Sequence, residues 1–243
     1  QEPVSGLPLP ALAGRDEPVM LAKCFAGPVV VAPRRIEGAT VAAALGCDVV
    51  VLDDGFQHWR LARDVDLICI DALDPFGNGR LLPAGPLREP LGALRRATAF
   101  LLTRTDLCDA ESLGTLRARI RALAGDRPVA ESVHRPAALV GIGAAALPDH
   151  APEWLRGRAV YAFCGIGNPR SFEGTLAALR ADVAKCRRFP DHHPYTEDDL
   201  CRIDAEAREF MAEVLVTTEK DAARLGDADL SMPLYTLRVE LDV

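Results

Sequence analysis

Three short segments of this 243-residue sequence combine residue types that could do chemistry. The segment LDDGFQH (52–58) ends an apolar run with two adjacent carboxylates, Asp53 and Asp54. Because adjacent carboxylates repel each other, backbone N–H groups, a cation or a metal ion must compensate them. An aspartate at the end of a buried parallel strand can hold Mg²⁺ beside nucleotide phosphates. A lone aspartate is more often a helix or turn cap, but the pair followed by Gln57 and His58 favours a functional site.

The second segment, FGNGRLLPAGPLREP (76–90), is rich in glycine and proline and also carries Arg80, Arg88 and Glu89. A connection of this length without periodicity is typical of a functional loop or of a disordered one. Its backbone could approach a ligand closely, and its arginines could reach phosphate groups. Taken alone, the segment fits an ordinary surface loop equally well.

The third segment, FPDHHPY (189–195), places an acid and two imidazoles directly after an apolar strand. Histidine can act as a base, a metal ligand or a charge partner. A single histidine is more often structural, but the run Asp191-His192-His193 between prolines favours function. Two further motifs are interpreted as structural: the Gly165–Asn168 stretch as a tight strand-to-helix turn, and Thr218 with Asp221 as a helix capping box.

The composition is that of a globular protein, with 49% hydrophobic and 26% charged residues. A net charge of −7 argues against a general nucleic-acid binder, which would show a basic face. No apolar stretch reaches the ~20 residues that a membrane-spanning helix needs, and the first ten residues do not resemble a signal peptide. The seven cysteines form no CxxC pair, which is typical of free thiols in a reducing compartment such as the cytoplasm.

Apolar runs of strand length alternate with helical stretches, which predicts an α/β protein with mostly parallel sheets. A domain boundary is expected near residue 135, giving domains 1–135 and 136–243. The expected strands are 28–32, 48–52, 66–71, 99–103, 158–164, 184–189 and 213–217. The expected helices are 40–45, 110–124, 169–180 and 197–211.

Five motifs together resemble the tetraacyldisaccharide 4′-kinase family of lipid A biosynthesis in Gram-negative bacteria. LDDGFQHWRLARDVDLICID, FGNGRLLPAGPLREP, FCGIGNP, FPDHHPY and VTTEKDAARL occur in the order and approximate spacing of that family. GRDEPVMLA (14–22) also resembles its GDEPxLLA segment. The resemblance runs from about Gly14 to the C-terminus, and five motifs in order are far more specific than any one of them.

The resemblance implies two α/β/α domains joined by a short hinge, the first (1–135) P-loop-kinase-like and the second (136–243) closing over the active site. It implies transfer of the ATP γ-phosphate, with Mg²⁺, to the 4′-hydroxyl of a lipid disaccharide 1-phosphate. The expected setting is the cytoplasmic face of the inner membrane, with no nucleic-acid partner and a monomeric protein. The roles it implies are catalysis by Asp16 and His192, nucleotide binding by Asp53, Gln57 and His58, substrate binding by Glu17, Arg88 and Glu89, and metal binding by Asp54.

One family feature is missing from the sequence. The P-loop pattern G-x-x-x-x-G-K-[ST] does not occur, and none of the lysines Lys23, Lys185 and Lys220 follows a glycine-rich loop. The loop's N–H groups and lysine are the main anchor for nucleotide phosphates. We therefore expect an N-terminally shortened kinase that is inactive as it stands.

Two other classes of protein remain open from the residues alone. A metal-dependent DHH-type phosphoesterase could use Asp53, Asp54 and the Asp191–His193 run to gather divalent metals. Such an enzyme needs further Asp and His ligands early in its first domain, where this sequence offers only Asp16. The other alternative is a binding module that holds the lipid without turning it over.

Overall fold

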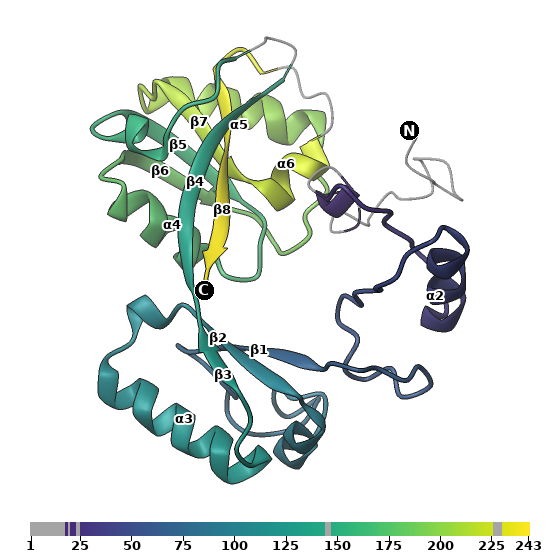
Figure 1. Ribbon diagram of the computed structural model, residues 1–243. Helices are drawn as coiled ribbons and strands as arrows, with labels where there is room; N and C mark the ends of the chain where they lie inside the picture. Colours follow the sequence, from purple (N-terminus) through teal and green to yellow (C-terminus); the bar gives the residue numbers. More distant parts are fainter. Residues whose placement is uncertain (1–17, 19, 23–24, 144–146, 226–229) are drawn as a thin grey trace. The chain divides into compact units, whose positions relative to one another are not determined.

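The structure is a computed structural model that describes residues 18, 20–22, 25–143, 147–225 and 230–243. The chain divides into two compact units (Figure 1). Unit 1 is built around Pro136–Val239 and unit 2 around Asp48–Arg135, each with shorter stretches outside that range. Across the described ranges, no helix is both long enough and apolar enough to cross a membrane.

Unit 1 contains a sheet with the strand order β4-β8-β7-β5-β6. Its central strands are parallel, since β5 pairs in parallel with β6 and β7, and β7 with β8. The strands are β4 (Val133–Ile142), β5 (Ala159–Cys164), β6 (Asp182–Arg188), β7 (Val214–Thr218) and β8 (Leu234–Asp242). The helices are η4 (Pro152–Leu155), α4 (Pro169–Ala178), α5 (Glu197–Glu209) and α6 (Glu219–Leu225).

Strand β5 is apolar along nearly its whole length because both of its faces are buried. Successive side chains of a strand point to opposite faces of the sheet. Val160 and Ala162 accordingly belong to the core cluster that includes Leu176 of α4, whereas Tyr161 belongs to the cluster that includes Ile203 of α5. The sheet is thus covered on both faces, which is the arrangement that continuous apolar strands predict.

The carboxyl edge of this sheet positions the candidate chemistry of unit 1. Helices α4, α5 and α6 follow β5, β6 and β7, so the three strand-to-helix connections lie at the same edge. The Asn168 side chain caps α4 by accepting a hydrogen bond from the Ser171 N–H. Thr196 and Asp199 form a reciprocal capping box at the start of α5. These caps fix where each helix begins and therefore the length of each connection.

Unit 2 contains the parallel sheet β1-β2-β3 with helix α3 packed on it. Leu116 and Ile120 of α3 pack with Phe100 and Leu102 of β2 in one buried cluster. The Asp109 side chain caps α3 by accepting from the Ser112 N–H at 2.7 Å. The elements of unit 2 are β1 (Leu67–Asp71), η2 (Leu91–Arg96), β2 (Ala99–Thr103), η3 (Thr105–Leu107), α3 (Ala110–Ala124) and β3 (Val129–Glu131). Helix α2 (Arg35–Ala44) is divided between the two units.

The α/β class with mostly parallel sheets is confirmed, but two expected strands are wrong. Residues 28–32 and 48–52 have no strand structure, and Val49 and Val51 are 79% and 86% exposed. A strand exists only where a neighbour completes its hydrogen-bond ladder. In the described part of the chain no segment pairs with either run, so an apolar sequence alone does not make them strands.

Candidate functional site

The FPDHHPY segment forms a tight turn after β6, which we call the histidine turn (Pro190–His193). The His193 N–H donates to the Pro190 carbonyl at 3.2 Å, and the His192 N–H donates to the Gly165 carbonyl at 3.1 Å. His192 has a left-handed backbone with φ of 58°. Such a conformation is uncommon for a residue with a side chain and persists only where the surroundings hold it. The connection that follows β5 therefore holds the turn in place, through the hydrogen bond from the His192 N–H to the Gly165 carbonyl.

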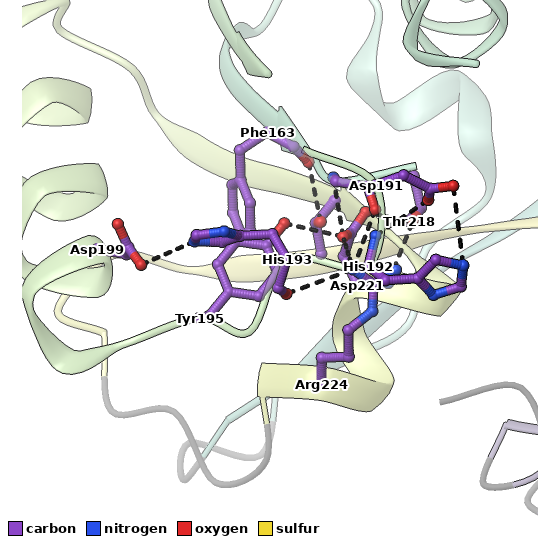
Figure 2. A network of polar contacts seen from close by, with 11 residues as sticks. Phe163, Asp191, His192, His193, Tyr195, Asp199, Thr218, Asp221 and Arg224 are labelled. Carbon is purple, nitrogen blue, oxygen red and sulfur yellow. Dashed lines mark hydrogen bonds and ion pairs between the residues drawn. The ribbon is translucent and has the colours of Figure 1, made fainter. Parts of the chain in front are cut away.

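The two histidines of the turn have different environments. Figure 2 shows their imidazoles pointing in opposite directions. His193 is 22% exposed at its side chain, with Nε2 2.9 Å from Asp199 Oδ2 and its ring stacked on Phe189. His192 is 57% exposed, and its Nε2 lies 3.8 Å from Asp191 Oδ2. His193 thus packs inside unit 1, whereas His192 presents its ring to solvent beside a carboxylate.

A buried carboxylate lies beneath the histidine turn. Asp221, in the first turn of α6, is 0% exposed. Its Oδ1 accepts from the Gly165 N–H at 2.9 Å and from the Tyr195 hydroxyl at 2.8 Å, and its Oδ2 accepts from the Thr218 hydroxyl at 2.6 Å. Burial and the nearby Asp221 charge raise the pKa of the Tyr195 hydroxyl, which stays a hydrogen-bond donor. Through Gly165, Tyr195 and Thr218 this network links the connections after β5, β6 and β7, and Figure 2 shows Tyr195 and Thr218 beside Asp221.

Asp199 ties the histidine turn to helix α5. Its Oδ2 also accepts from the Thr196 backbone N–H at 3.1 Å and the Thr196 hydroxyl at 2.9 Å. The hydrogen bond from His193, followed by those from Thr196, lowers the pKa of the Asp199 carboxyl to about 2. Since its side chain is 17% exposed, solvent screens these contacts only in part.

The lowered pKa of Asp199 predicts a pH-dependent contribution to stability. A carboxyl whose pKa is lower in the folded state stabilises the protein above its unfolded pKa, and this stabilisation is lost as pH falls through about 2. We expect Asp199→Asn to lower the free energy of unfolding by about 2 kcal/mol at pH 7. Urea unfolding between pH 7 and pH 2 measures the difference, which should shrink below about pH 4.

Asp198→Asn is the matched control for this prediction. Asp198 is exposed and lies in the same first turn of α5, so the substitution removes the same charge from the same helix terminus. It should change stability by no more than about 0.5 kcal/mol. An equal loss in the two variants would assign the effect to the helix terminus rather than to the contacts of Asp199.

In unit 2 the structure brings two predicted segments together. Arg88 donates to Asp54 Oδ2 at 2.5 Å, and both side chains are more than half exposed. The hydrogen bond that Arg88 donates to Asp54, together with the negative charge of that carboxylate, raises the pKa of the Arg88 guanidinium. Asp54 has a left-handed backbone with φ of 50° at a turn. The LDDGFQH and LREP motifs, far apart in the sequence, thus meet through a carboxylate and a guanidinium.

A second contact between these motifs joins Gln57 to Glu89, and Arg96 holds Glu89 in place. Gln57 Nε2 donates to Glu89 Oε1 at 3.1 Å, and Glu89 accepts two hydrogen bonds from Arg96, at 2.8 and 2.9 Å. The Arg96 guanidinium also lies 4.2 Å from the ring centres of both Phe56 and Trp59. The hydrogen bonds from Arg96 lower the pKa of the Glu89 carboxyl. Glu89 is therefore held as a carboxylate by an arginine that also contacts two aromatic rings.

The carboxylates of the LDDGFQH segment suit a magnesium ion, which prefers one or two carboxylate oxygens together with phosphate oxygens and water. Asp53 and Asp54 are both exposed, and Arg88 contacts Oδ2 of Asp54.

A metal-dependent phosphoesterase would need a metal site formed by several protein ligands. No three His, Cys, Asp or Glu side chains gather to hold a metal ion anywhere in the described ranges. The Asp191–His193 run therefore has no such cluster around it, and the metal-dependent phosphoesterase is not supported.

The structure brings some of the predicted site residues together and leaves others apart. Arg88 meets Asp54, and Glu89 meets Gln57, whereas Asp53 and His58 are exposed at the same segment. Asp16 and Glu17 lie outside the described residues. Sequence reasoning missed Arg96 and Asp199 and assigned Asp221 only a capping role. The only sequence signal for Asp221 was its place in a capping box, which does not reveal burial.

Unit 1 is an α/β layer structure in which polar groups gather after the carboxyl ends of parallel strands, as in α/β ligand-binding proteins. A sequence model of the LpxK family, described as tetraacyldisaccharide-1-P 4′-kinase, matches residues 8–243. The chain therefore belongs to the tetraacyldisaccharide 4′-kinase family.

Individual relatives agree with this assignment. The chain is 48% identical over 226 residues to the tetraacyldisaccharide 4′-kinase of Anaeromyxobacter dehalogenans (strain 2CP-C), covering 92% of this chain and 59% of the relative. It is 39% identical to that of Syntrophus aciditrophicus, covering 96% of this chain and 64% of the relative. The crystal structure of LpxK from Aquifex aeolicus in complex with ATP matches with a TM-score of 0.64 and 28% identity, over 93% of this chain and 64% of that one. The chain thus spans about three fifths of the length of these relatives.

Proposed function

We propose that the protein containing this chain transfers the γ-phosphate of ATP to the 4′-hydroxyl of a tetraacyldisaccharide 1-phosphate in lipid A biosynthesis. The observation that carries the proposal is the histidine turn of a family member, in which His193 is held by Asp199 while His192 faces solvent beside Asp191. A sugar hydroxyl attacks phosphorus only if a base takes its proton as the new bond forms. An exposed imidazole beside a carboxylate can accept or share that proton.

The proposed catalytic pair is Asp16 as the base and His192 as its partner. Asp53, Gln57 and His58 are proposed to contact ATP, which the Aquifex aeolicus relative binds in its crystal structure. Glu17, Arg88 and Glu89 are proposed to contact the lipid substrate. An arginine such as Arg88 suits the 1-phosphate because its planar fork of donors matches phosphate oxygens.

Mg²⁺ is the proposed metal, with Asp54 as its protein ligand. When bound, it neutralises charge on the β- and γ-phosphates of ATP. Within the chain, the contact between Arg88 and Asp54 fixes the carboxylate at the turn after residue 52. Glu89 is kept ionised and oriented by Arg96, so these two arginines set the direction of both acidic groups.

The arrangement proposed for the complete enzyme is that of two domains. Residues 1–135 would form the catalytic, P-loop-kinase-like domain, and residues 136–243 a second domain that closes over the active site. Closure would bring His192 to the substrate and exclude water from the reaction. The proposed setting is the cytoplasmic face of the bacterial inner membrane, where the lipid substrate lies, with the enzyme acting as a monomer.

The test is a phosphotransfer assay with purified protein. The complete gene product, with any residues that it has outside the 243 given, should convert tetraacyldisaccharide 1-phosphate and labelled ATP into the 1,4′-bisphosphate when Mg²⁺ is present. Failure with the complete product would contradict the proposed function. The 243-residue chain alone should show negligible turnover, because its sequence lacks the glycine-rich loop and lysine that cradle nucleotide phosphates. Robust phosphorylation by the 243 residues alone would refute that argument.

A further inference from the structure

The buried carboxylate of Asp221 makes more contacts than a helix cap requires. Capping of α6 uses Thr218, whose hydroxyl donates to Asp221 Oδ2 and accepts from the Asp221 N–H at 3.2 Å. Oδ1 makes two further hydrogen bonds, from the Gly165 N–H and the Tyr195 hydroxyl. Cap residues ordinarily lie at the surface, and a buried charge is costly unless it is paired and hydrogen-bonded. The position of Asp221 thus serves something beyond the start of a seven-residue helix.

The extra contacts lead directly to His192. Asp221 holds the N–H of Gly165, and the carbonyl of the same glycine accepts from the His192 N–H at 3.1 Å and from Arg224 at 3.0 Å. Arg224 lies 3.4 Å from Asp221 Oδ1 and also donates to the His193 carbonyl at 3.4 Å. Both polar groups of Gly165 are therefore fixed, one by Asp221 and the other by His192 and Arg224.

There is little room for this arrangement to shift. A Cβ atom at Gly165 would lie 3.0 Å from the Pro190 carbonyl oxygen and 3.3 Å from both Asp221 Oδ1 and His193 Cβ. The connection after β5 is thus packed against the histidine turn and the carboxylate at once. His192 in turn has the left-handed backbone that only its surroundings can maintain.

We propose that Asp221 is the positioning residue of the histidine turn, which through Gly165 fixes the backbone of His192 and so the direction of its exposed imidazole. Tyr195 contributes from the other end of the turn, because its hydroxyl donates to the same Asp221 oxygen. The kinetic part of this inference rests on the proposed kinase function. Asp221 itself is buried and acts on the reaction only through His192.

The kinetic test is a double-mutant cycle in the complete gene product. Asp221→Asn keeps the shape of the side chain but removes its charge, and we expect kcat to fall at least tenfold with the KM for ATP within threefold of wild type. In a His192→Ala background the same substitution should change kcat less than threefold, because a residue that acts through His192 has nothing left to position. An equal loss in both backgrounds, or no loss in either, would overturn the proposal.

Two further variants keep the test decisive if Asp221→Asn folds poorly. Gly165→Ala retains Asp221 but pushes on the turn, and its loss of kcat should also disappear in the His192→Ala background. Glu206→Gln is the matched control, since Glu206 holds Tyr161, Lys185 and Arg187 and contacts none of the turn residues named above. Glu206→Gln should lose stability but keep kcat within threefold of wild type. A kcat loss for Glu206→Gln as large as that for Asp221→Asn would overturn the proposal.

Amide hydrogen exchange separates this proposal from the kinase function. In Asp221→Asn the His192 amide should exchange at least tenfold faster relative to the core amides of β5, even if the complete protein has no kinase activity. The His192 N–H also lies 3.0 Å from Asp191 Oδ1, so Asp191→Ala is measured beside it to remove that second acceptor. The proposal is overturned if Asp221→Asn leaves the exchange rate of the His192 amide unchanged, either with Asp191 present or in the Asp191→Ala background. This outcome does not depend on the enzyme assay.

Discussion

His192→Ala in the complete gene product is expected to lower kcat by about 10²–10⁴-fold, the range typical of a lost proton-transfer group. The KM values for ATP and for the lipid should change little, because His192 is proposed to act on the sugar hydroxyl proton rather than to bind either substrate. Its side chain is 57% exposed, so the free energy of unfolding should change by no more than about 1 kcal/mol. Steady-state kinetics and urea unfolding of the purified variant measure the two effects.

His193→Ala is the matched control for this prediction, because the two histidines are adjacent and differ in environment. His193 is hydrogen-bonded to Asp199, stacked on Phe189 and in edge contact with Tyr195. Its removal should cost about 1–3 kcal/mol of stability, with a smaller loss of kcat than for His192→Ala. A larger loss of kcat in His193→Ala than in His192→Ala would show that His193, and not His192, takes part in the proton transfer.

The proposed partnership with Asp16 gives this prediction a second arm. Residues that act as one unit give losses that do not multiply when both are removed. Asp16→Ala and Asp16→Ala/His192→Ala should therefore have similar kcat values. If the two losses multiply, or if Asp16→Ala stays within about tenfold of wild type, which is roughly 1.4 kcal/mol of barrier, the pair does not exist.

Much of the fold could be predicted because local patterns and tertiary structure agree. The predicted bounds of β2 (99–103) and α3 (110–124) are those of the structure, since β2 is a short apolar run and α3 has a capping Asp109 and a terminal Gly125. β8 was not predicted, because its sequence LYTLRVELD mixes charged with apolar residues and its last residues are exposed. The run at 48–52 shows the opposite error, a predicted strand that the structure does not contain, because its apolar residues have no neighbouring strand to pair with in the described part of the chain.

The candidate site was predictable in its segments but not in its contacts. The acidic pair, the LREP segment and the histidine run each stood out by residue type, and the structure places Arg88 on Asp54. Nothing in the sequence indicated that Arg96 would hold Glu89 while contacting the rings of Phe56 and Trp59, because these contacts depend on how η2 packs. Likewise, the burial of Asp221 arises only when three strand-to-helix connections meet at one sheet edge.

Asp54→Ala should lower kcat/KM of the complete gene product by about 10²–10³-fold, the loss typical of removing one electrostatic contact to the developing charge. The structure argues against a stability effect of that size. The Asp54 side chain is 60% exposed and its contact with Arg88 is a surface ion pair, which contributes no more than about 1 kcal/mol. The large loss of activity should therefore come with a nearly unchanged unfolding transition. Raising the Mg²⁺ concentration should recover part of the activity, because a weakened metal site is filled by mass action.

Two controls decide whether the carboxylate itself is responsible. Asp64→Ala removes another exposed acid of unit 2 and should leave both kinetics and Mg²⁺ dependence unchanged. Arg88→Ala breaks the same ion pair from the other side but leaves the Asp54 carboxylate in place, so it should raise the KM for the lipid and shift the Mg²⁺ requirement less than Asp54→Ala does. Asp53→Ala tests the register, since either member of the adjacent pair could face the metal. If Asp53→Ala and Asp54→Ala both keep wild-type turnover at low Mg²⁺, the two carboxylates only cap the turn, and Arg88 has a structural partner rather than a place in the active site.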